Sequence, residues 1–317
     1  MKQQTIGFVG LGVMGRHVAR RLVEAGHRVQ AYDINPEPLT HFEQAGGVAS
    51  KSAAAATENA SHIIIFVVNG EQSEQVIFGP GGIHETAARG LTIISCVTML
   101  PAEARSLGER CHEQGWSFID APVSGGEVGA KNGDLTVMAS GERAALDGSH
   151  TLLMQIGTRV KRVGDQPGQG ALVKTINQLL CGVHLAAAGE AIAMAQRAGL
   201  ETQAVFDVVS QSAAGSWMLS NRGPRMLASA FDTSASAVDI FVKDLGIVMD
   251  VARELKFPAS LAATALQSFL GASGAGLGLK DDSAVVQYYN RFLPRDAGTD
   301  IKAPLHGCGT VVNRGAA

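Results

Sequence analysis

A glycine-rich turn near the N-terminus constrains the fold more than any other part of the chain. The apolar run Ile6 to Val9 leads into GLGVMG, residues 10–15, and a helical pattern follows from Arg16 to Ala25. A second strand pattern, 28–32, ends at Asp33. The order strand, GxGxxG turn, helix, strand and acidic residue is typical of a βαβ unit that binds a dinucleotide.

Each part of this unit has a physical role. Gly10 permits the tight turn, Gly12 lets the backbone approach a pyrophosphate, and Gly15 lets the helix pack closely on the strand. We expect the turn to bind the cofactor through Gly10, Leu11, Gly12, Val13, Met14 and Gly15, with the phosphates at the helix N-terminus. Asp33 should accept hydrogen bonds from the ribose hydroxyls and repel a 2′-phosphate, so we expect NAD rather than NADP. The alternative is a glycine-rich turn in some other α/β protein.

Strand and helix patterns continue to alternate up to residue 163. The run SHIIIFVV, residues 61–68, is apolar throughout, as expected of a parallel strand that is covered on both faces. The alternation predicts an α/β, Rossmann-type, doubly wound domain. Asn69 follows this strand and Thr98 follows the next, at the sheet edge where ligands bind, so both are candidate cofactor contacts. Ordinary capping of the loops would explain them equally well.

The segment GDQPGQG, residues 164–170, marks a domain boundary. From Gly168 to Leu200 the chain is rich in Ala and Leu, and some thirty helical residues would span roughly 45 Å. Lys174 and Asn177 are neighbours on one face near its start. A lysine is unusual there, because a helix N-terminus is itself electropositive. Lys174 therefore either extends to solvent or faces a cleft as a catalytic ammonium.

The rest of the chain has helical patterns at 203–210, 241–255, 259–271 and 283–291. They predict an all-α domain that packs around the long interdomain helix. We expect an NAD-binding domain over residues 1–165 and a helical domain for substrate binding and oligomerisation over 166–295. Residues 296–317 are rich in Gly without periodicity, which predicts a loose tail.

Composition narrows the class of protein. The formal net charge of −3 gives no electrostatic case for binding nucleic acid or an anionic membrane. Apolar runs such as 63–68 are too short to cross a bilayer, and a strand pattern that begins at Thr5 leaves no room for a signal peptide. The four cysteines lack CxxC spacing and the histidines lack HxxxH or HExxH. We therefore expect reduced thiols, a cytoplasmic location and no metal site.

Four segments carry a resemblance to a known family. They are GLGVMGRHVARRLVEAG, DAPVSGGEVGAKNGDLTVM, GQGALVKTINQ and FVKDL. Their order and spacing resemble the β-hydroxyacid dehydrogenases, a family that includes enzymes for 3-hydroxyisobutyrate and tartronate semialdehyde. The resemblance covers about residues 5–295 and implies NAD-dependent oxidation of a small hydroxy acid by a homodimer or homotetramer.

Within the family, three segments are most similar to the L-threonate dehydrogenase branch: INQLLCGVHLAAAGEA, SAAGSWM and SAVDIFVKDLGIVMD. This similarity implies oxidation of a short sugar acid, L-threonate, to 2-dehydro-L-erythronate. Reduction of tartronate semialdehyde or oxidation of 3-hydroxyisobutyrate is the alternative. A protein of a different class, a non-catalytic NAD-binding sensor, also fits the N-terminal motif.

The resemblance also implies residue roles. Lys174 corresponds to the catalytic lysine, acting as general acid or base. The substrate contacts correspond to Ser124, Gly125, Gly126, Asn177 and Lys243. Lys243 also corresponds to a residue near the cofactor, as do Asn69 and Thr98. One departure is Gln178, which stands where the family usually has a second Asn.

Overall fold

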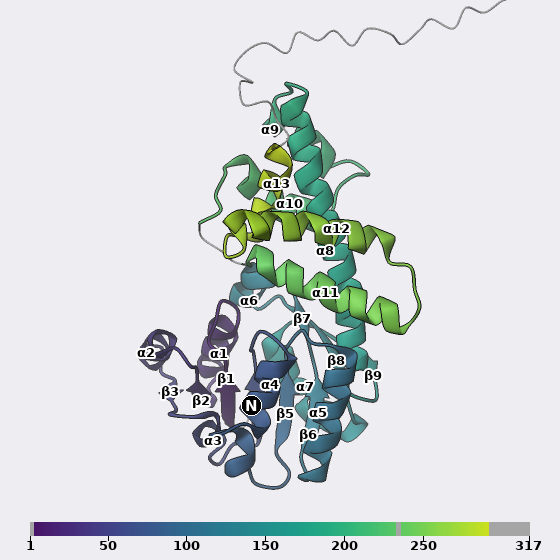
Figure 1. The fold of residues 1–317 in the computed structure, drawn as a ribbon. Coiled ribbons are helices and arrows are strands. Elements are labelled where there is room, and N and C mark those ends of the chain that lie inside the picture. Colours follow the sequence, from purple (N-terminus) through teal and green to yellow (C-terminus); the bar gives the residue numbers. More distant parts are fainter. Residues whose placement is uncertain (1–2, 233–235, 292–317) are drawn as a thin grey trace, which may run out of the picture.

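The computed structural model describes residues 3–232 and 236–291, which form a sheet covered by helices and a helical layer beyond it (Figure 1). The described strands are β1 (Thr5–Val9), β2 (Arg28–Tyr32), β3 (Val48–Ala49), β4 (His62–Ile65), β5 (Thr92–Ser95), β6 (Ser117–Asp120), β7 (Val123–Ser124), β8 (Thr136–Ser140) and β9 (Arg159–Gly164). The tail predicted at 296–317 lies outside the described residues.

The sheet has the strand order β3-β2-β1-β4-β5-β6-β8-β7, and β9 pairs with β8. Strands β1 to β6 are mutually parallel, while β8 runs antiparallel to β6 and to β7. Ile63, Ile64 and Ile65 of β4 are completely buried because apolar clusters cover both faces of the sheet. The predicted doubly wound Rossmann-type fold is confirmed.

Helices cover this sheet on its two faces. They are α1 (Gly15–Glu24), α2 (Pro36–Gln44), α3 (Ala53–Ala56), α4 (Gly70–Phe78), the 3₁₀ turn η1 (Ile83–Glu85), α5 (Pro101–Glu113), α6 (Gly126–Asn132) and α7 (Arg143–Ile156). Helix α6 directly follows Ser124 and Gly125, where the sequence analysis predicted no helix. Strand β4 is shorter than the predicted 61–68, because Phe66, Val67 and Val68 leave the sheet at the edge where the cavity described below begins.

Helix α8 (Gln169–Arg197) joins the two parts of the molecule and runs through the centre of the second (Figure 1). Around it lie α9 (Thr202–Ser210), α10 (Trp217–Leu227), α11 (Val238–Glu254), α12 (Ser260–Ala272), the π-helical turn η2 (Ser273–Leu277), the 3₁₀ turn η3 (Asp282–Val285) and α13 (Val286–Asn290). The predicted all-α second domain, built around one long helix, is confirmed.

Small residues on α8 allow its neighbours to approach closely. A Cβ added at Gly182 would lie 2.7 Å from the side chain of Leu245 on α11, so a larger residue there would force Leu245 to move. By length and composition α8 could also cross a bilayer, contrary to the expectation that every apolar segment is too short. Half of its most apolar 18-residue stretch is buried inside the fold.

Candidate active site

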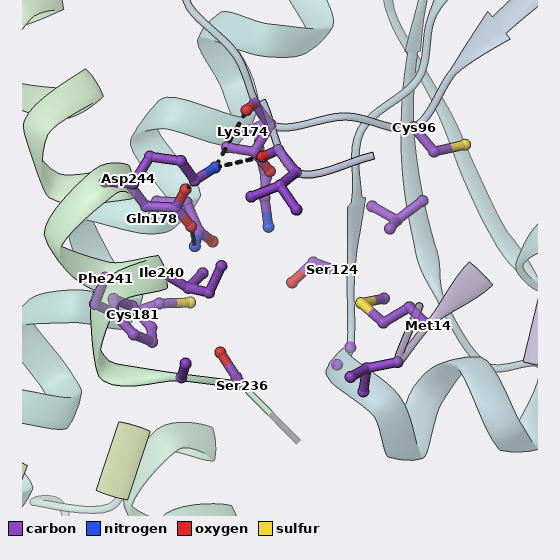
Figure 2. A pocket seen from close by; sticks show the side chains of 18 of the residues that line it. Met14, Cys96, Ser124, Lys174, Gln178, Cys181, Ser236, Ile240, Phe241 and Asp244 are labelled. Carbon is purple, nitrogen blue, oxygen red and sulfur yellow. Dashed lines mark hydrogen bonds and ion pairs between the residues drawn. The ribbon is translucent and has the colours of Figure 1, made fainter. Parts of the chain in front are cut away.

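A cavity of about 480 Å³ lies between the carboxyl edge of the sheet and helices α8, α10 and α11. In Figure 2, Met14 of the glycine turn stands on one side of it and Gln178 and Asp244 on the other, with Ser124 and Lys174 between them. Both halves of the chain thus contribute walls to one site. Among the described residues, no group of three or more His, Cys, Asp or Glu side chains could hold a metal ion.

The glycine turn has the geometry that its sequence predicts. Gly10 has φ +96°, in the left-handed region that favours glycine. A Cβ at Gly15 would lie 2.0 Å from the carbonyl oxygen of Gly10, so a side chain there would displace the start of α1. A Cβ at Gly12 would meet nothing within 4 Å, which leaves open space over the turn beside the cavity. This open cradle fits the pyrophosphate of a dinucleotide, held by the turn and the N-terminus of α1.

Asp33 lies at the end of β2 and holds the glycine turn. Its Oδ2 accepts a hydrogen bond from the backbone N–H of Leu11 at 2.6 Å, and its Oδ1 accepts one from Asn35 at 2.8 Å. Val13 and Met14 line the cavity, whereas Leu11 is buried. Asp33 therefore fixes the shape of the turn, in addition to the contact with ribose that we predict for it.

The two predicted contacts after β4 and β5 differ in their positions. Asn69 is the N-cap of α4, where its Oδ1 accepts a hydrogen bond from the backbone N–H of Gln72 at 2.8 Å. Thr98 lies in the cavity wall. The structure thus gives Asn69 the capping role that the sequence left open, and it places Thr98 where a bound molecule could touch it.

Lys174 lies in the second turn of α8, buried and facing the cavity. No hydrogen bond or ion pair to another described residue occupies its Nζ. Burial lowers the pKa of the Lys174 ammonium, while the Asp244 carboxylate and Cys181 oppose the shift and Lys243 adds to it. The sequence left two interpretations of Lys174 open. In the structure the lysine faces the cleft and does not extend to solvent.

Asp120 at the end of β6 fixes the start of the helix that carries Lys174. Its Oδ2 accepts hydrogen bonds from the backbone N–H groups of Gly168 at 2.9 Å and Ala171 at 2.8 Å, and from the Ser140 hydroxyl at 3.3 Å. Burial raises the pKa of the Asp120 carboxyl to about 6, and these hydrogen bonds oppose the rise. A carboxylate at a helix N-terminus also complements the helix dipole.

The loop Ser124, Gly125 and Gly126 lines the cavity between the glycine turn and α8. The Ser124 hydroxyl donates a hydrogen bond to Asn177 Oδ1 at 3.4 Å. The Asn177 amide in turn donates to Gln178 Oε1 at 2.8 Å, so Asn177 connects the loop to the next residue of the helix. Gln178 lines the cavity, whereas Asn177 does not.

Lys243 joins the two halves of the site from α11. Its Nζ donates hydrogen bonds to the carbonyl oxygens of Val68 at 2.9 Å and Thr98 at 3.3 Å, and it pairs with Asp244 at 2.8 Å. The two carbonyl oxygens accept two of the three N–H donors of the ammonium. Lys243 lines the cavity as predicted, and it also ties α11 to the loops after β4 and β5.

In the wall that the helical domain contributes, sequence reasoning missed Gln178, Arg222 and Asp244. Gln178 donates to Asp244 Oδ2 at 2.5 Å, and Asp244 is 3% exposed. Arg222 is 6% exposed and also lines the cavity. The remaining members of this wall are Cys181, Trp217, Met218, Ser236, Ala237, Ile240 and Phe241. A charged residue at a helix position that should be buried was the available signal for Arg222 and Asp244.

Two family models match the chain. The NAD binding domain of 6-phosphogluconate dehydrogenase matches residues 5–164, and the NAD-binding domain of NADP-dependent 3-hydroxyisobutyrate dehydrogenase matches residues 168–289. Both models describe proteins that bind a nicotinamide dinucleotide, in agreement with the open cradle over Gly12.

Similar proteins cover nearly the whole chain. An L-threonate dehydrogenase from Cupriavidus necator is 46% identical over 286 residues, which are 90% of this chain and 96% of the relative. An L-threonate dehydrogenase from Escherichia coli K12 is 41% identical over 90% of this chain and 94% of its own length. A crystal structure of a 3-hydroxyisobutyrate dehydrogenase from Salmonella typhimurium has a TM-score of 0.84 at 41% identity, over 89% of this chain and 98% of that one.

Identity of this extent, together with the two matched domains and the cleft between them, identifies the class of enzyme. The cofactor is a nicotinamide dinucleotide and the substrate a small molecule. The chain belongs to the 3-hydroxyisobutyrate dehydrogenase family, as an NAD-dependent hydroxyacid dehydrogenase.

Proposed function

We propose that the protein oxidises L-threonate at C2 to 2-dehydro-L-erythronate with NAD, and that Lys174 is the general base. The observation that carries the proposal is the position of Lys174, a buried lysine without a described hydrogen-bond partner that faces the cavity shared by the glycine turn and the Ser124 loop. Five relatives named L-threonate dehydrogenase, 39–46% identical, support this choice of substrate.

In this proposal, different residues of the cleft bind the substrate and transfer the proton. The Ser124 hydroxyl and the backbone of Gly125 and Gly126 bind the substrate carboxylate, and Lys174 accepts the proton of the C2 hydroxyl. A nicotinamide dinucleotide held by the glycine turn would supply the acceptor for the hydride that leaves C2. In the reverse direction Lys174 returns the proton to the oxygen.

Lys174 must be neutral to accept a proton. An ordinary lysine has a pKa of about 10.4 and is protonated at neutral pH. Burial, the first cause of the lowered pKa of Lys174, makes the neutral amine more accessible, and Asp244 limits the effect. Asp120 and Lys243 position the elements of the site. Asp120 caps α8, and Lys243 ties α11 to the loops after β4 and β5.

A second candidate is oxidation of 3-hydroxyisobutyrate. The observation in its favour is the crystal structure from Salmonella typhimurium, which is 41% identical and carries that name. Both acids present a carboxylate and a hydroxyl group, so the Ser124 loop and Lys174 would serve either of them. The substrates differ in the position of the reacting hydroxyl, which is on C2 of L-threonate, next to the carboxyl carbon, and on C3 of 3-hydroxyisobutyrate, one carbon further away.

A spectrophotometric screen of NAD reduction at 340 nm tests the proposal. The panel contains L-threonate, D-threonate, D- and L-erythronate, D-glycerate and 3-hydroxyisobutyrate, each repeated with NADP. We expect turnover of L-threonate with NAD. Preference for 3-hydroxyisobutyrate would replace the substrate and keep the role of Lys174, whereas NAD binding without turnover of any acid would favour a non-catalytic protein.

A further inference from the structure

Arg222 is a buried arginine in the wall of the cavity to which neither the sequence motifs nor the mechanism assigns a role. It lies on α10, is 6% exposed and faces the same cavity as Lys174. Lys174 and Cys181 of α8 border this cavity as well, so Arg222 and the proposed base belong to one site.

The guanidinium of Arg222 is held in a fixed orientation. Its Nε donates to Asp282 Oδ1 at 2.7 Å and its Nη2 donates to Asp282 Oδ2 at 3.0 Å. Its Nη1 donates to the side chain of Asn221. Asp282 is itself completely buried at the start of η3. A two-point contact of this kind fixes the plane of the guanidinium as well as its position.

These contacts leave part of the guanidinium free. Arginine has five N–H donors, and the hydrogen bonds to Asp282 and Asn221, which are those that Arg222 makes to described residues, use three of them. Two N–H groups remain in a side chain that borders the cavity. Buried donors without acceptors are unfavourable, so a bound molecule with oxygen atoms at this point would be stabilised.

The buried ion pair between Arg222 and Asp282 also calls for a functional explanation. Removing two charges from water often costs more free energy than their attraction recovers, and apolar residues of similar volume could fill the same space. Apolar side chains lie beside Arg222: the centroid of the Trp217 ring is 5.8 Å from its Cζ, and Ile240 and Phe241 of α11 line the same cavity. Arg222 is therefore a fixed cationic donor next to side chains that suit the carbon chain of a substrate.

We propose that Arg222 determines specificity by donating its two remaining N–H groups to the hydroxyl oxygens at the end of the substrate remote from the carboxylate. This inference rests on the proposed function, in which L-threonate carries hydroxyl groups at C3 and C4 beyond the reacting C2. An acid with an alkyl end offers no acceptor there and leaves both donors unsatisfied.

The test compares L-threonate with 2-hydroxybutyrate of the same configuration at C2, which has the same chain length and lacks the two distal hydroxyls. We expect Arg222→Gln to lower kcat/KM for L-threonate by about ten- to a hundred-fold, the loss of hydrogen bonds from a charged group. The value for 2-hydroxybutyrate should stay within about threefold of the wild type, because no such bond is lost.

Two further variants separate this role from a structural one. Arg225 lies three residues along the same helix and pairs with Asp281 at 2.8 Å, but does not line the cavity, so Arg225→Gln is the matched control and should leave the ratio of the two acids unchanged. Arg222→Gln combined with Asp282→Asn removes both buried charges in case Arg222→Gln alone does not fold. The double variant should show the same loss of preference.

Equal losses for both acids, or an unchanged ratio in the folded Arg222 variants, would overturn the assignment of Arg222 while leaving the proposed function intact. Absence of wild-type turnover of L-threonate would instead overturn the proposed function and this assignment with it.

Discussion

The glycine turn and the wall made by α10 and α11 show two ways in which one site is encoded. The turn is local, since one run of six residues supplies its shape and Asp33 supports it from the next strand. The opposite wall draws Arg222 and Asp244 from separate helices, each held by a partner distant in sequence. Local geometry can be inferred from spacing, whereas the wall depends on how helices pack.

The largest effect on activity is expected from a substitution in α8, the helix between these two regions. Lys174→Ala should lower kcat by about 10²–10⁴-fold, because general acid–base catalysis contributes that much. NAD affinity should change little, since the glycine turn is remote in sequence and separately supported. Steady-state kinetics and a fluorescence titration with NADH measure the two quantities, and near-normal turnover would exclude Lys174 as the base.

Asp120 lies at the start of α8, where the two regions join, and it should make the free energy of unfolding depend on pH. Its pKa rises from 3.8 to about 6 on folding, so the folded state binds the proton more tightly. Its contribution to stability is fully present below pH 3.8 and is lost as the pH rises through about 6. The loss is on the order of 3 kcal/mol at most.

Asp120→Asn removes this titration. The free energy of unfolding of the variant relative to the wild type should therefore increase as the pH rises from 4 to 7. Urea unfolding at a series of pH values measures the difference. A difference that stays constant over this range would show that Asp120 does not titrate there.

A smaller effect is expected at the cofactor end. Asp33→Ser removes the charge that should repel a 2′-phosphate, so the ratio of kcat/KM for NAD to that for NADP should fall by up to about fivefold, the size of one exposed electrostatic contact. Because Asp33 also accepts hydrogen bonds from the backbone N–H groups of Leu11 and Asn35, kcat/KM should fall to some extent with both cofactors. An unchanged ratio would contradict a contact between Asp33 and the ribose.

The smallest effects concern the charges around Lys174. In the oxidation direction the rate should rise with pH as Lys174 loses its proton. Asp244 raises the pKa of Lys174 and Lys243 lowers it. Asp244→Asn should therefore move the rise in kcat to lower pH, and Lys243→Met should move it to higher pH. Shifts of the same sign in the two pH profiles would contradict this assignment.

The sequence could predict most elements of the fold because their signals are periodic and local. Helix α1 (Gly15–Glu24) lies within one residue of its predicted span, 16–25, and the alternation of strands and helices indicated the doubly wound sheet. Helix α6 was missed because its segment is short and rich in glycine, both of which favour a loop. Its start is set by the glycine loop that borders the cavity.

By itself, the sequence determined the glycine turn, the acidic residue after the second strand and a lysine at the start of a long helix, since each is a property of neighbouring residues. The tertiary structure decided what surrounds that lysine. Gln178 rather than Asn177 lines the cavity, and Arg222 lies in its wall. Lys243 donates hydrogen bonds across the two domains. These features depend on contacts between residues far apart in the chain, which packing brings together and local spacing does not encode.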